Sequence, residues 1–294
     1  MISSKHNTLY LSSADRRLGA ILGLLAFAAA LVAALILLFL IDESWPLLGR
    51  ISPARFILDA SWHPTQGLYD LSPMLSATLL ASLGALLLAV PVGIGSALFG
   101  RYYAAAWLAA GYRRMIELLA GIPSVVYGFW GLTTLAPWIA RFEPPGVSLL
   151  TAILVLAIMI LPTVALTTDA ALAAVPQSRH RCAAALGLSR WTAISGVLLP
   201  SARKGIVSGI LLAAARAVGE TMAVLMVAGN VVQHPHGLFD PVRTLAANIA
   251  LEMAYAGGDH RAALFASGLV LLCIVLILAG TVQWYKTRDF YDQK

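Results

Sequence analysis

Long runs of apolar residues, separated by short polar segments, dominate the chain. A helix of about 20 apolar residues crosses a bilayer core about 30 Å thick, and runs of that length are bounded here by charged or turn-forming residues. Six runs meet this description: 18–41, 76–99, 115–139, 149–168, 206–232 and 262–285. The pattern predicts an all-α, polytopic bundle of six membrane-spanning helices, with Pro123 interrupting the third and two charges interrupting the fifth.

The six spans form one large domain between two short ends. We expect an N-terminal segment at 1–17, a transmembrane domain at 18–285 and a C-terminal tail at 286–294. The first apolar run is longer than the apolar core of a cleaved signal peptide, which has about 7–15 residues. We therefore interpret it as a retained anchor. An even number of spans places both ends of the chain on the same side.

Composition agrees with this pattern and excludes several classes of protein. Hydrophobic residues make up 60% of the 294 residues and charged residues 12%, whereas a soluble domain has about 45–50% and about 25%. A disordered chain, a soluble enzyme and a disulfide-stapled secreted module are excluded. The net charge of +6 does not indicate nucleic-acid binding, because no basic stretch is interleaved with aromatic residues.

The basic residues instead predict the orientation of the chain. With the N-terminus inside, the cytoplasmic segments contain 14 lysines and arginines and the outer segments contain 5, and cytoplasmic loops are typically enriched in these residues. We therefore expect a multi-pass membrane protein with both ends in the cytoplasm. The outer loops are then 42–75, 140–148 and 233–261, and the inner loops are 100–114 and 169–205.

The sequence carries no motif for catalysis or for a cofactor. It has no Gly-rich phosphate-binding loop, so ATP hydrolysis is not expected in this chain, and no nucleophile–base pair is visible. The pair His234 and His236 is a weak signal for a metal, and Cys182 and Cys273 lie at different predicted depths, which disfavours a disulfide. We expect no enzyme activity, no metal and no cofactor.

The longer inner loop has a pattern of its own between residues 179 and 200. A helical stretch meets Gly187, a natural helix stop, and a second stretch follows in which apolar residues from Trp191 and Ile194 onward recur at helical spacing. Pro200 is expected to end this second stretch. The pattern predicts a short helix–turn–helix on the cytoplasmic face, able to seat an apolar side chain in a soluble partner.

This spacing resembles the EAA loop of ABC-transporter permeases, in which Glu-Ala-Ala is followed by a glycine and later by Leu-Pro. Gly187 and the following Leu-Pro pair fit the spacing, whereas Arg181 stands in the place of the glutamate. The resemblance implies that residues 179–200 form the coupling helix that seats in an ATPase subunit. The residues expected at that contact are Ala183, Ala184, Gly187, Trp191, Leu199 and Pro200. An ordinary amphipathic loop is the alternative interpretation.

Two charges lie inside the fifth span. Arg216 and Glu220 stand four residues apart, which predicts that they share one face of a continuous helix. A lone charge at the bilayer centre costs about 2.5–3.5 kcal/mol, and charges in spans usually face a bundle interior or an aqueous path. The guanidinium offers a planar fork of donors to an oxyanion. Glu220 would hold Arg216 in place or release it when an anion arrives. The alternative is a purely structural ion pair that fixes helix packing.

Two longer motifs resemble those of the PstC-type permeases of phosphate ABC importers. The run from Arg216 to Val224 reads Arg-Ala-Val-Gly-Glu-Thr-Met-Ala-Val, and the family has Arg-Ala-Leu-Gly-Glu-Thr-Met-Ala-Val. The block from Glu117 to Leu132, which contains Ile-Pro-Ser-Val-Val-Tyr-Gly, is similar to a second family motif, and the resemblance extends over roughly residues 15–290. The sister PstA permeases usually lack the Met-Ala-Val extension, which favours the C-type subunit.

The resemblance implies the type I ABC importer permease fold in a bacterial inner membrane, together with several partners. These are a PstA-like permease that forms a heterodimer with this chain, a PstB-like ATPase dimer below and a PstS-like periplasmic phosphate-binding protein above. It also implies that Arg216 and Glu220 act in phosphate passage, and we assign the adjacent Thr221 to the same pathway. Membrane lipid surrounds the spans in this interpretation, and nucleic acid is not an expected partner.

Other functions stay open at this point. A permease for another oxyanion, such as sulfate or molybdate, would use the same charges, and a phosphate sensor acting through the same complex would use the same partners. An intramembrane enzyme or a channel is disfavoured, because no catalytic constellation is visible and because a channel has no need of a coupling loop.

Overall fold

The structure, a computed structural model, describes residues 13–52 and 54–291, and most of this part of the chain is helical. The helices are α1 (Ser13–Leu48), α2 (Arg55–Leu58), α3 (Ser72–Leu98), α4 (Ala106–Ala120), α5 (Ser124–Trp130), α6 (Ala136–Ile139), α7 (Leu149–Ala173), α8 (Gln177–Ala185), α9 (Arg190–Ala193), α10 (Leu199–Val218), α11 (Met222–Val227), α12 (Leu245–Glu252) and α13 (Gly258–Tyr291). Short π-helical turns join some of them, at Phe99–Tyr103, Gly131–Leu135 and Ile194–Leu198, and a 3-10 turn lies at Pro64–Gln66. The strands β1 (Trp62–His63) and β2 (Leu68–Tyr69) form one antiparallel hairpin with Trp62 opposite Tyr69.

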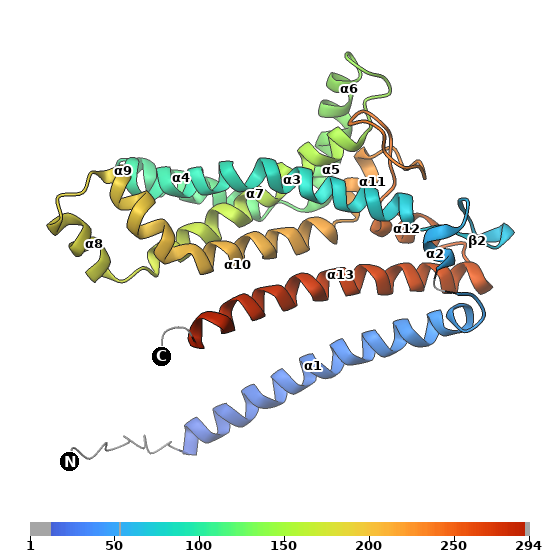
Figure 1. The fold of residues 1–294 in the computed structure, drawn as a ribbon, viewed down its shortest axis with the longest axis horizontal. Helices are drawn as coiled ribbons and strands as arrows, with labels where there is room; N and C mark the ends of the chain where they lie inside the picture. The colour runs from blue at the N-terminus through green and yellow to red at the C-terminus, as the bar shows by residue number, and fades with distance from the viewer. Residues whose placement is uncertain (1–12, 53, 292–294) are drawn as a thin grey trace.

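The long helices run roughly side by side between two ends of the molecule (Figure 1). One end carries α8 and α9, and we refer to it as the α8 end; the other carries α12 and the hairpin, and we refer to it as the α12 end. The first turn of α1 and the last turn of α13 both lie at the α8 end. The described ends of the chain therefore lie on one side, as the even number of spans predicts, and the loop 179–200 lies on the same side. Most of the predicted N-terminal segment, 1–17, lies outside the described residues.

Five helices in the described part of the chain are long and apolar enough to cross a membrane. They are Arg17–Leu48, Ser72–Tyr103, Leu149–Ala173, Arg190–Val218 and Gly258–Thr281. A bent pair, Ala106–Ala120 followed by Ser124–Ile139, makes a sixth if it is counted as one span. The prediction of an all-α bundle with several membrane spans is confirmed.

The third predicted span, 115–139, is interrupted at Pro123, as the sequence predicts, but its helix starts earlier than predicted, at Ala106. The chain turns by 91° between α4 and α5. Pro123 has extended backbone with ψ of 140° and cannot donate a hydrogen bond to the preceding turn. The hydroxyl of Tyr127 donates to the carbonyl oxygen of Leu119 at 2.7 Å across the bend, which satisfies a polar group that the break would otherwise leave exposed to lipid.

The fifth predicted span, 206–232, is also shifted in the structure. Its helix begins at Arg190 and ends at Val218, and it passes through Pro200 without a break. The prediction that Pro200 ends a helix is therefore wrong. Pro200 lies in the first turn of α10, where a missing N–H is tolerated, and the preceding π-helical turn, in which the Leu199 N–H bonds to the Ile194 oxygen, absorbs the mismatch.

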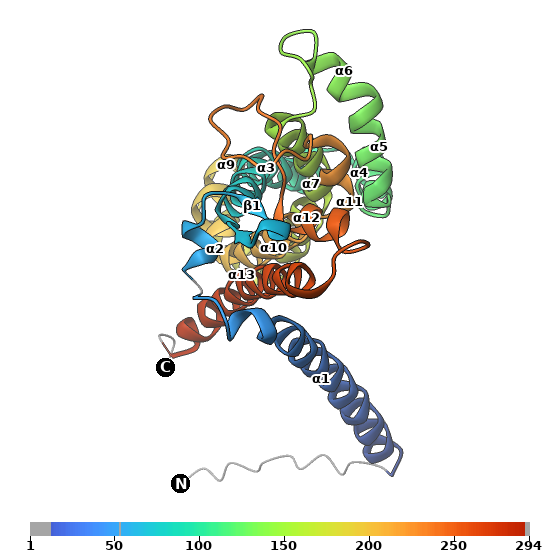
Figure 2. The same ribbon diagram turned by 90° about the vertical axis from the view of Figure 1, so that its right-hand side faces the viewer.

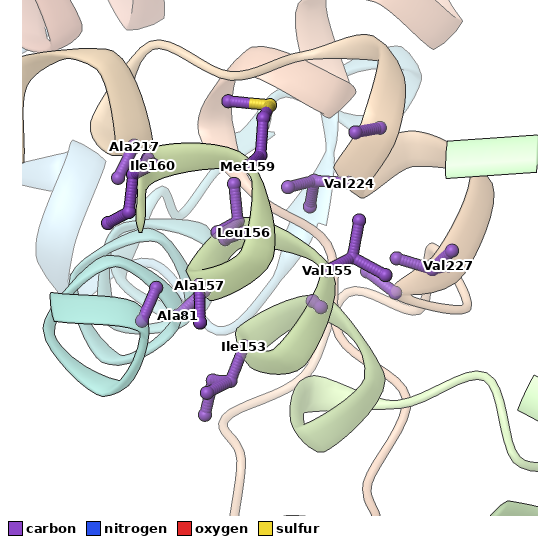
Figure 3. Close-up of a cluster of buried hydrophobic side chains, with 14 of the residues drawn as sticks. Ala81, Ile153, Val155, Leu156, Ala157, Met159, Ile160, Ala217, Val224 and Val227 are labelled. Atoms are coloured by element: carbon purple, nitrogen blue, oxygen red, sulfur yellow. The ribbon is translucent and has the colours of Figure 1, made fainter. Parts of the chain in front are cut away.

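Helix α7 is the centre of the bundle, and α3, α4, α10 and α11 all pack against it. Figure 3 shows its buried side chains, among them Leu156 and Met159, between Ala81 of α3 and Val224 of α11. Small residues permit the close approach: a Cβ on Gly93 would lie 2.8 Å from a methyl carbon of Val164. Such small-residue contacts are a main source of helix association in lipid, where burial of apolar surface gives little driving force.

Helix α1 packs chiefly against α13 and leans away from the rest of the bundle (Figure 2). Phe39 and Phe265 meet edge to face with ring centroids 5.5 Å apart. Closer to the α12 end, Arg261 donates to Glu43 at 3.3 Å. Most of the large apolar side chains between Leu18 and Ile41 are exposed, as expected for a helix surrounded by lipid.

A buried carboxylate organises the α12 end. Glu252 Oε1 accepts from Arg243 Nη1 at 2.7 Å, and its Oε2 lies 2.9 Å from both Trp62 Nε1 and His260 Nε2. Arg243 Nη1 also donates to Asn248 Oδ1 at 3.0 Å. This Glu252 cluster (Trp62, Arg243, Asn248, Glu252 and His260) joins the hairpin, the segment before α12, α12 itself and the first turns of α13.

Candidate functional site

The predicted charge pair lies at a break between two helices. Helix α10 ends at Val218, and α11 begins at Met222. Gly219, which has no side chain to restrict the backbone, is the C-cap of α10. The prediction that Arg216 and Glu220 share a face of one continuous helix is therefore wrong, because the helix stops between them.

Each charge is matched by a helix end instead of by its expected partner. Arg216 is in the last turn of α10, where the partial negative charge of the helix dipole favours a cation. The Glu220 carboxylate accepts from the Ala223 N–H at 3.1 Å and caps the start of α11, where the dipole favours an anion. Thr221 donates its hydroxyl hydrogen to the Gly219 carbonyl at 3.3 Å, within the same turn.

The guanidinium of Arg216 is exposed on the surface of the chain. Within the described residues it has no hydrogen bond and no ion pair, although it is close enough to the Tyr127 hydroxyl for an electrostatic interaction. A free guanidinium keeps its fork of donors for an oxyanion. The break between α10 and α11 thus presents an uncommitted cation.

The two helix breaks of the bundle lie beside each other. Helix α11 packs against α5, and a Cβ on Gly128 would lie 2.8 Å from the Cα of Ala223. Only glycine permits this distance, which brings the middle of α5 against the first turn of α11, just after Glu220. The motifs that contain Tyr127 and Arg216 are far apart in the sequence and are neighbours in the fold.

The loop 179–200 is a helix–turn–helix, as predicted. Helix α8 ends at Ala185, Gly187 follows its C-cap with φ of +64°, and the N–H of Leu188 bonds to the Ala183 oxygen at 3.2 Å. This is a Schellman end, which requires the left-handed conformation that glycine adopts most readily. Ser189 then caps α9, because its hydroxyl oxygen accepts from the Thr192 N–H at 3.2 Å.

The six residues expected at the ATPase contact differ in exposure. Trp191 is 62% exposed, and Ala184, Gly187 and Pro200 are exposed as well. Ala183 is buried and Leu199 is half-buried, so these two support the loop from within. Arg181, at the position that departs from the EAA pattern, is exposed.

Polar contacts tie this loop to the bundle. Arg190 Nη1 donates to the Tyr102 carbonyl at 3.1 Å, and its guanidinium lies over the Tyr103 ring, 5.5 Å from the centroid. Arg179 donates to the Ser201 hydroxyl at 2.7 Å. The helix that starts in this loop at Arg190 continues to the turn that holds Arg216, so one continuous helix connects the two candidate sites.

Sequence reasoning did not assign several residues that the structure brings to notice. Tyr127 is inside a recognised motif, yet its bond across the bend depends on the 91° turn. Glu252, a carboxylate in an otherwise apolar stretch, is the kind of signal that could have indicated the Glu252 cluster. No group of three or more potential metal ligands is present in the described part of the chain, and Cys182 and Cys273 are unpaired.

Comparison with known proteins gives a consistent result. Residues 89–288 match the family described as binding-protein-dependent transport system inner membrane component. The chain is 35% identical to the phosphate transport system permease protein PstC of Haemophilus influenzae, over 93% of each chain. It is 37% identical to the probable ABC transporter permease protein YqgH of Bacillus subtilis, over 82% of this chain and 80% of that one.

Solved structures share the fold at low sequence identity. A bacterial ABC transporter that imports alginate matches with a TM-score of 0.57 and 16% identity, over 91% of this chain and 98% of the other. The MetNI methionine ABC transporter in an inward-facing conformation matches with a TM-score of 0.56 and 19% identity, over 73% and 92%. At these identities the likeness concerns the arrangement of the helices.

Proposed function

The chain belongs to the binding-protein-dependent transport system inner membrane components, as a PstC-type permease of an ABC transporter, and we propose that it passes inorganic phosphate into the cytoplasm. A periplasmic PstS-like protein delivers the phosphate, a PstA-like permease completes the path and a PstB-like ATPase dimer drives alternating access. Both termini and the α8 end face the cytoplasm in this proposal, in line with the distribution of basic residues. The proposal rests on the 35% sequence identity with PstC, which covers 93% of both chains.

Arg216 is the residue that we propose meets the phosphate. Its guanidinium is exposed, and within the described residues it has no anionic partner to be displaced. An arginine fork can donate two parallel hydrogen bonds to phosphate oxygens. Binding must stay weak enough for release, since a substrate held tightly would stall transport. Glu220 keeps the α10–α11 turn in shape by capping α11, and Thr221 stands beside it.

The loop 179–200 is the proposed docking element for the ATPase. Trp191 is the exposed apolar side chain that would enter a groove on that partner. The helix from Arg190 to Val218 then acts as a lever, because displacement at its start moves the turn that holds Arg216. This connection supports a mechanism in which ATP binding and access to phosphate change together.

Phosphate uptake into proteoliposomes that contain the full transporter tests the proposal. Arg216→Ala should reduce uptake of radiolabelled phosphate at least about tenfold, since a hydrogen-bonded charge contact is lost, whereas Arg216→Lys should retain part of it because the charge remains without the fork. Arg141→Ala removes an exposed cation elsewhere and serves as the control. Normal uptake with Arg216→Ala would contradict the role of this residue.

Competition experiments separate phosphate from its alternatives. Excess sulfate or molybdate should leave the uptake of labelled phosphate unchanged, and inhibition by either would favour a permease for another oxyanion. A chain that forms the complex and alters a phosphate response in cells, without moving phosphate in vesicles, would be a sensor.

A further inference from the structure

A cavity of about 290 Å³ lies between α3, α4 and α7 towards the α8 end, and no residue of either candidate site lines it. Figure 1 shows these helices running together there. Arg101, Arg113 and Asp169 give the cavity a charged rim, Ser96 and Tyr112 add hydroxyl groups, and the rest of the lining is apolar and mostly alanine. A charged rim beside an apolar floor matches an amphipathic ligand better than a small ion.

The cavity exists because the three helices present small side chains where they face one another. Ala97, Ala109 and Ala165 lie on α3, α4 and α7 respectively. The Ser96 and Tyr112 hydroxyl oxygens are 2.7 Å apart and tie α3 to α4 at one edge. Side chains as short as alanine leave the space between the helices unfilled, so a ligand can enter it.

The rim has hydrogen-bond donors to spare. Asp169 accepts from Arg101 Nε at 2.7 Å and from Arg113 Nη1 at 3.1 Å, so two guanidinium groups share one carboxylate. Arg113 Nε donates to the Glu117 carboxylate at 3.0 Å. Among the described residues no hydrogen bond uses Arg101 Nη1 or Arg113 Nη2. Two arginines and one carboxylate line the cavity, and Glu117, outside the lining, offsets part of their positive charge. The free donors of the two guanidinium groups are what suits a phosphate group.

The position of the rim indicates the source of that phosphate. The apolar stretches of α3 and α7 end close to Arg101 and Asp169 respectively, and α4 exposes apolar side chains such as Trp107 and Leu118. Charged residues at the ends of spans, with tryptophan beside them, are typical of the depth at which lipid headgroups meet acyl chains. Basic pockets between spans at this depth bind anionic lipid headgroups.

We propose that this cavity binds one anionic glycerophospholipid. Its phosphate accepts hydrogen bonds from Arg101 Nη1 and Arg113 Nη2, and part of an acyl chain covers the alanine floor. A free phosphate ion would leave that floor empty. The Asp169 ion pairs already join α4 to α7, and the bound lipid adds to this contact and stabilises the helix that leads to the 91° bend. This inference does not depend on what the protein transports.

Native mass spectrometry of the full chain, delipidated and then titrated with phosphatidylglycerol or phosphatidylcholine, tests the proposal. Wild-type protein should retain one phosphatidylglycerol and bind phosphatidylcholine far more weakly. Arg113→Gln should weaken phosphatidylglycerol binding at least about tenfold. Arg114→Gln, the neighbouring arginine outside the lining, makes the same change in net charge and should have little effect. Equal losses in the two variants would indicate diffuse surface attraction and would overturn the site.

Two further measurements keep the test decisive. Ala109→Phe fills the cavity without changing any charge and should also abolish retention, so unchanged binding in this variant would overturn the assignment. Displacement of the lipid by millimolar inorganic phosphate would indicate an ion site instead. If the variants fail to fold, photoactivatable phosphatidylglycerol applied to wild-type protein should form adducts on α4 or α7 near the cavity, and adducts spread evenly over all spans would refute the proposal.

Discussion

Glu252 offers the sharpest test of how the α12 end is held together. Its side chain is 11% exposed and that of its partner Arg243 is 19% exposed, with 2.7 Å between the charged atoms. Removing one partner of a buried ion pair leaves an uncompensated charge, which costs about 3–5 kcal/mol. Trp62 and His260 lose a hydrogen-bond acceptor at the same time. We expect Glu252→Ala to lower the free energy of unfolding by about that amount.

The isosteric change Glu252→Gln isolates the charge from the packing. Combined with Arg243→Gln in a double-mutant cycle, it should give a coupling free energy of about 2 kcal/mol or more, because the pair is largely shielded from water. Unfolding by sodium dodecyl sulfate in mixed micelles, followed by circular dichroism, measures each corner of the cycle.

An exposed ion pair at the same end of the molecule is the matched control. Arg50 and Asp259 are 3.2 Å apart, and their side chains are 67% and 49% exposed. Asp259→Asn should cost less than about 1 kcal/mol, since exposed pairs contribute little. If Glu252→Ala costs no more than this control, or if the coupling with Arg243 is close to zero, the Glu252 cluster does not carry the stability assigned to it.

Three other outcomes are expected. The bidentate hydrogen bond from Arg55 lowers the pKa of Asp59. The stabilisation from this pair is therefore complete above the ordinary pKa of about 3.9 and is lost as the pH falls through the lower pKa of the folded state. Thermal unfolding from pH 7 to pH 3 should show this loss in wild-type protein and not in Asp59→Asn. Gly209→Ala places a methyl group against the Thr167 hydroxyl and should lower the free energy of unfolding by about 1–3 kcal/mol in the same detergent titration. An unchanged free energy would mean that α10 and α7 are less closely packed than described. Gly187→Val forces a β-branched residue into a φ of +64°, which costs about 1–2 kcal/mol without crowding the side chain. ATP hydrolysis by the reconstituted transporter should continue while phosphate uptake falls. Unchanged uptake per ATP hydrolysed would argue against the docking loop.

Hydropathy predicted the existence of the spans and was poor at predicting where helices end. The apolar residues after Gly219 extend the hydropathy of the fifth run, so its window was placed beyond the end of α10 at Val218. Charge has a similar effect at the other end, because the basic residues between 190 and 204 read as a loop although they lie on a helix. A window average responds to composition and does not register the backbone hydrogen bonds that decide where a helix stops.

Proline positions were interpretable only with their surroundings. Pro123 breaks a helix and Pro200 does not, although each follows an apolar residue. The difference lies in the π-helical turn before Pro200, in which the Leu199 N–H bonds to the Ile194 oxygen and the helix continues. Nothing in the residue types alone distinguishes the two cases.

The choice of Arg216 and Glu220 stays a prediction, whereas the geometry expected for them was wrong. Arg216 and Glu220 were chosen because charges are costly in lipid, and that argument does not depend on the local fold. Their four-residue spacing predicted a pair, but spacing has this meaning only inside an unbroken helix. Gly219, an ordinary residue in a membrane helix, gave no sign that the helix ends there.

The packing of α1 on α13 has a consequence for biosynthesis. Residues such as Phe39 and Phe265, more than two hundred positions apart, meet only after nearly the whole chain has left the ribosome. Until then α1 sits in the bilayer without its partner, while α3 and α7 can already associate. Closure of the bundle is therefore a late event, and a nascent chain that stops before α13 leaves its first span unattached and open to quality-control proteases.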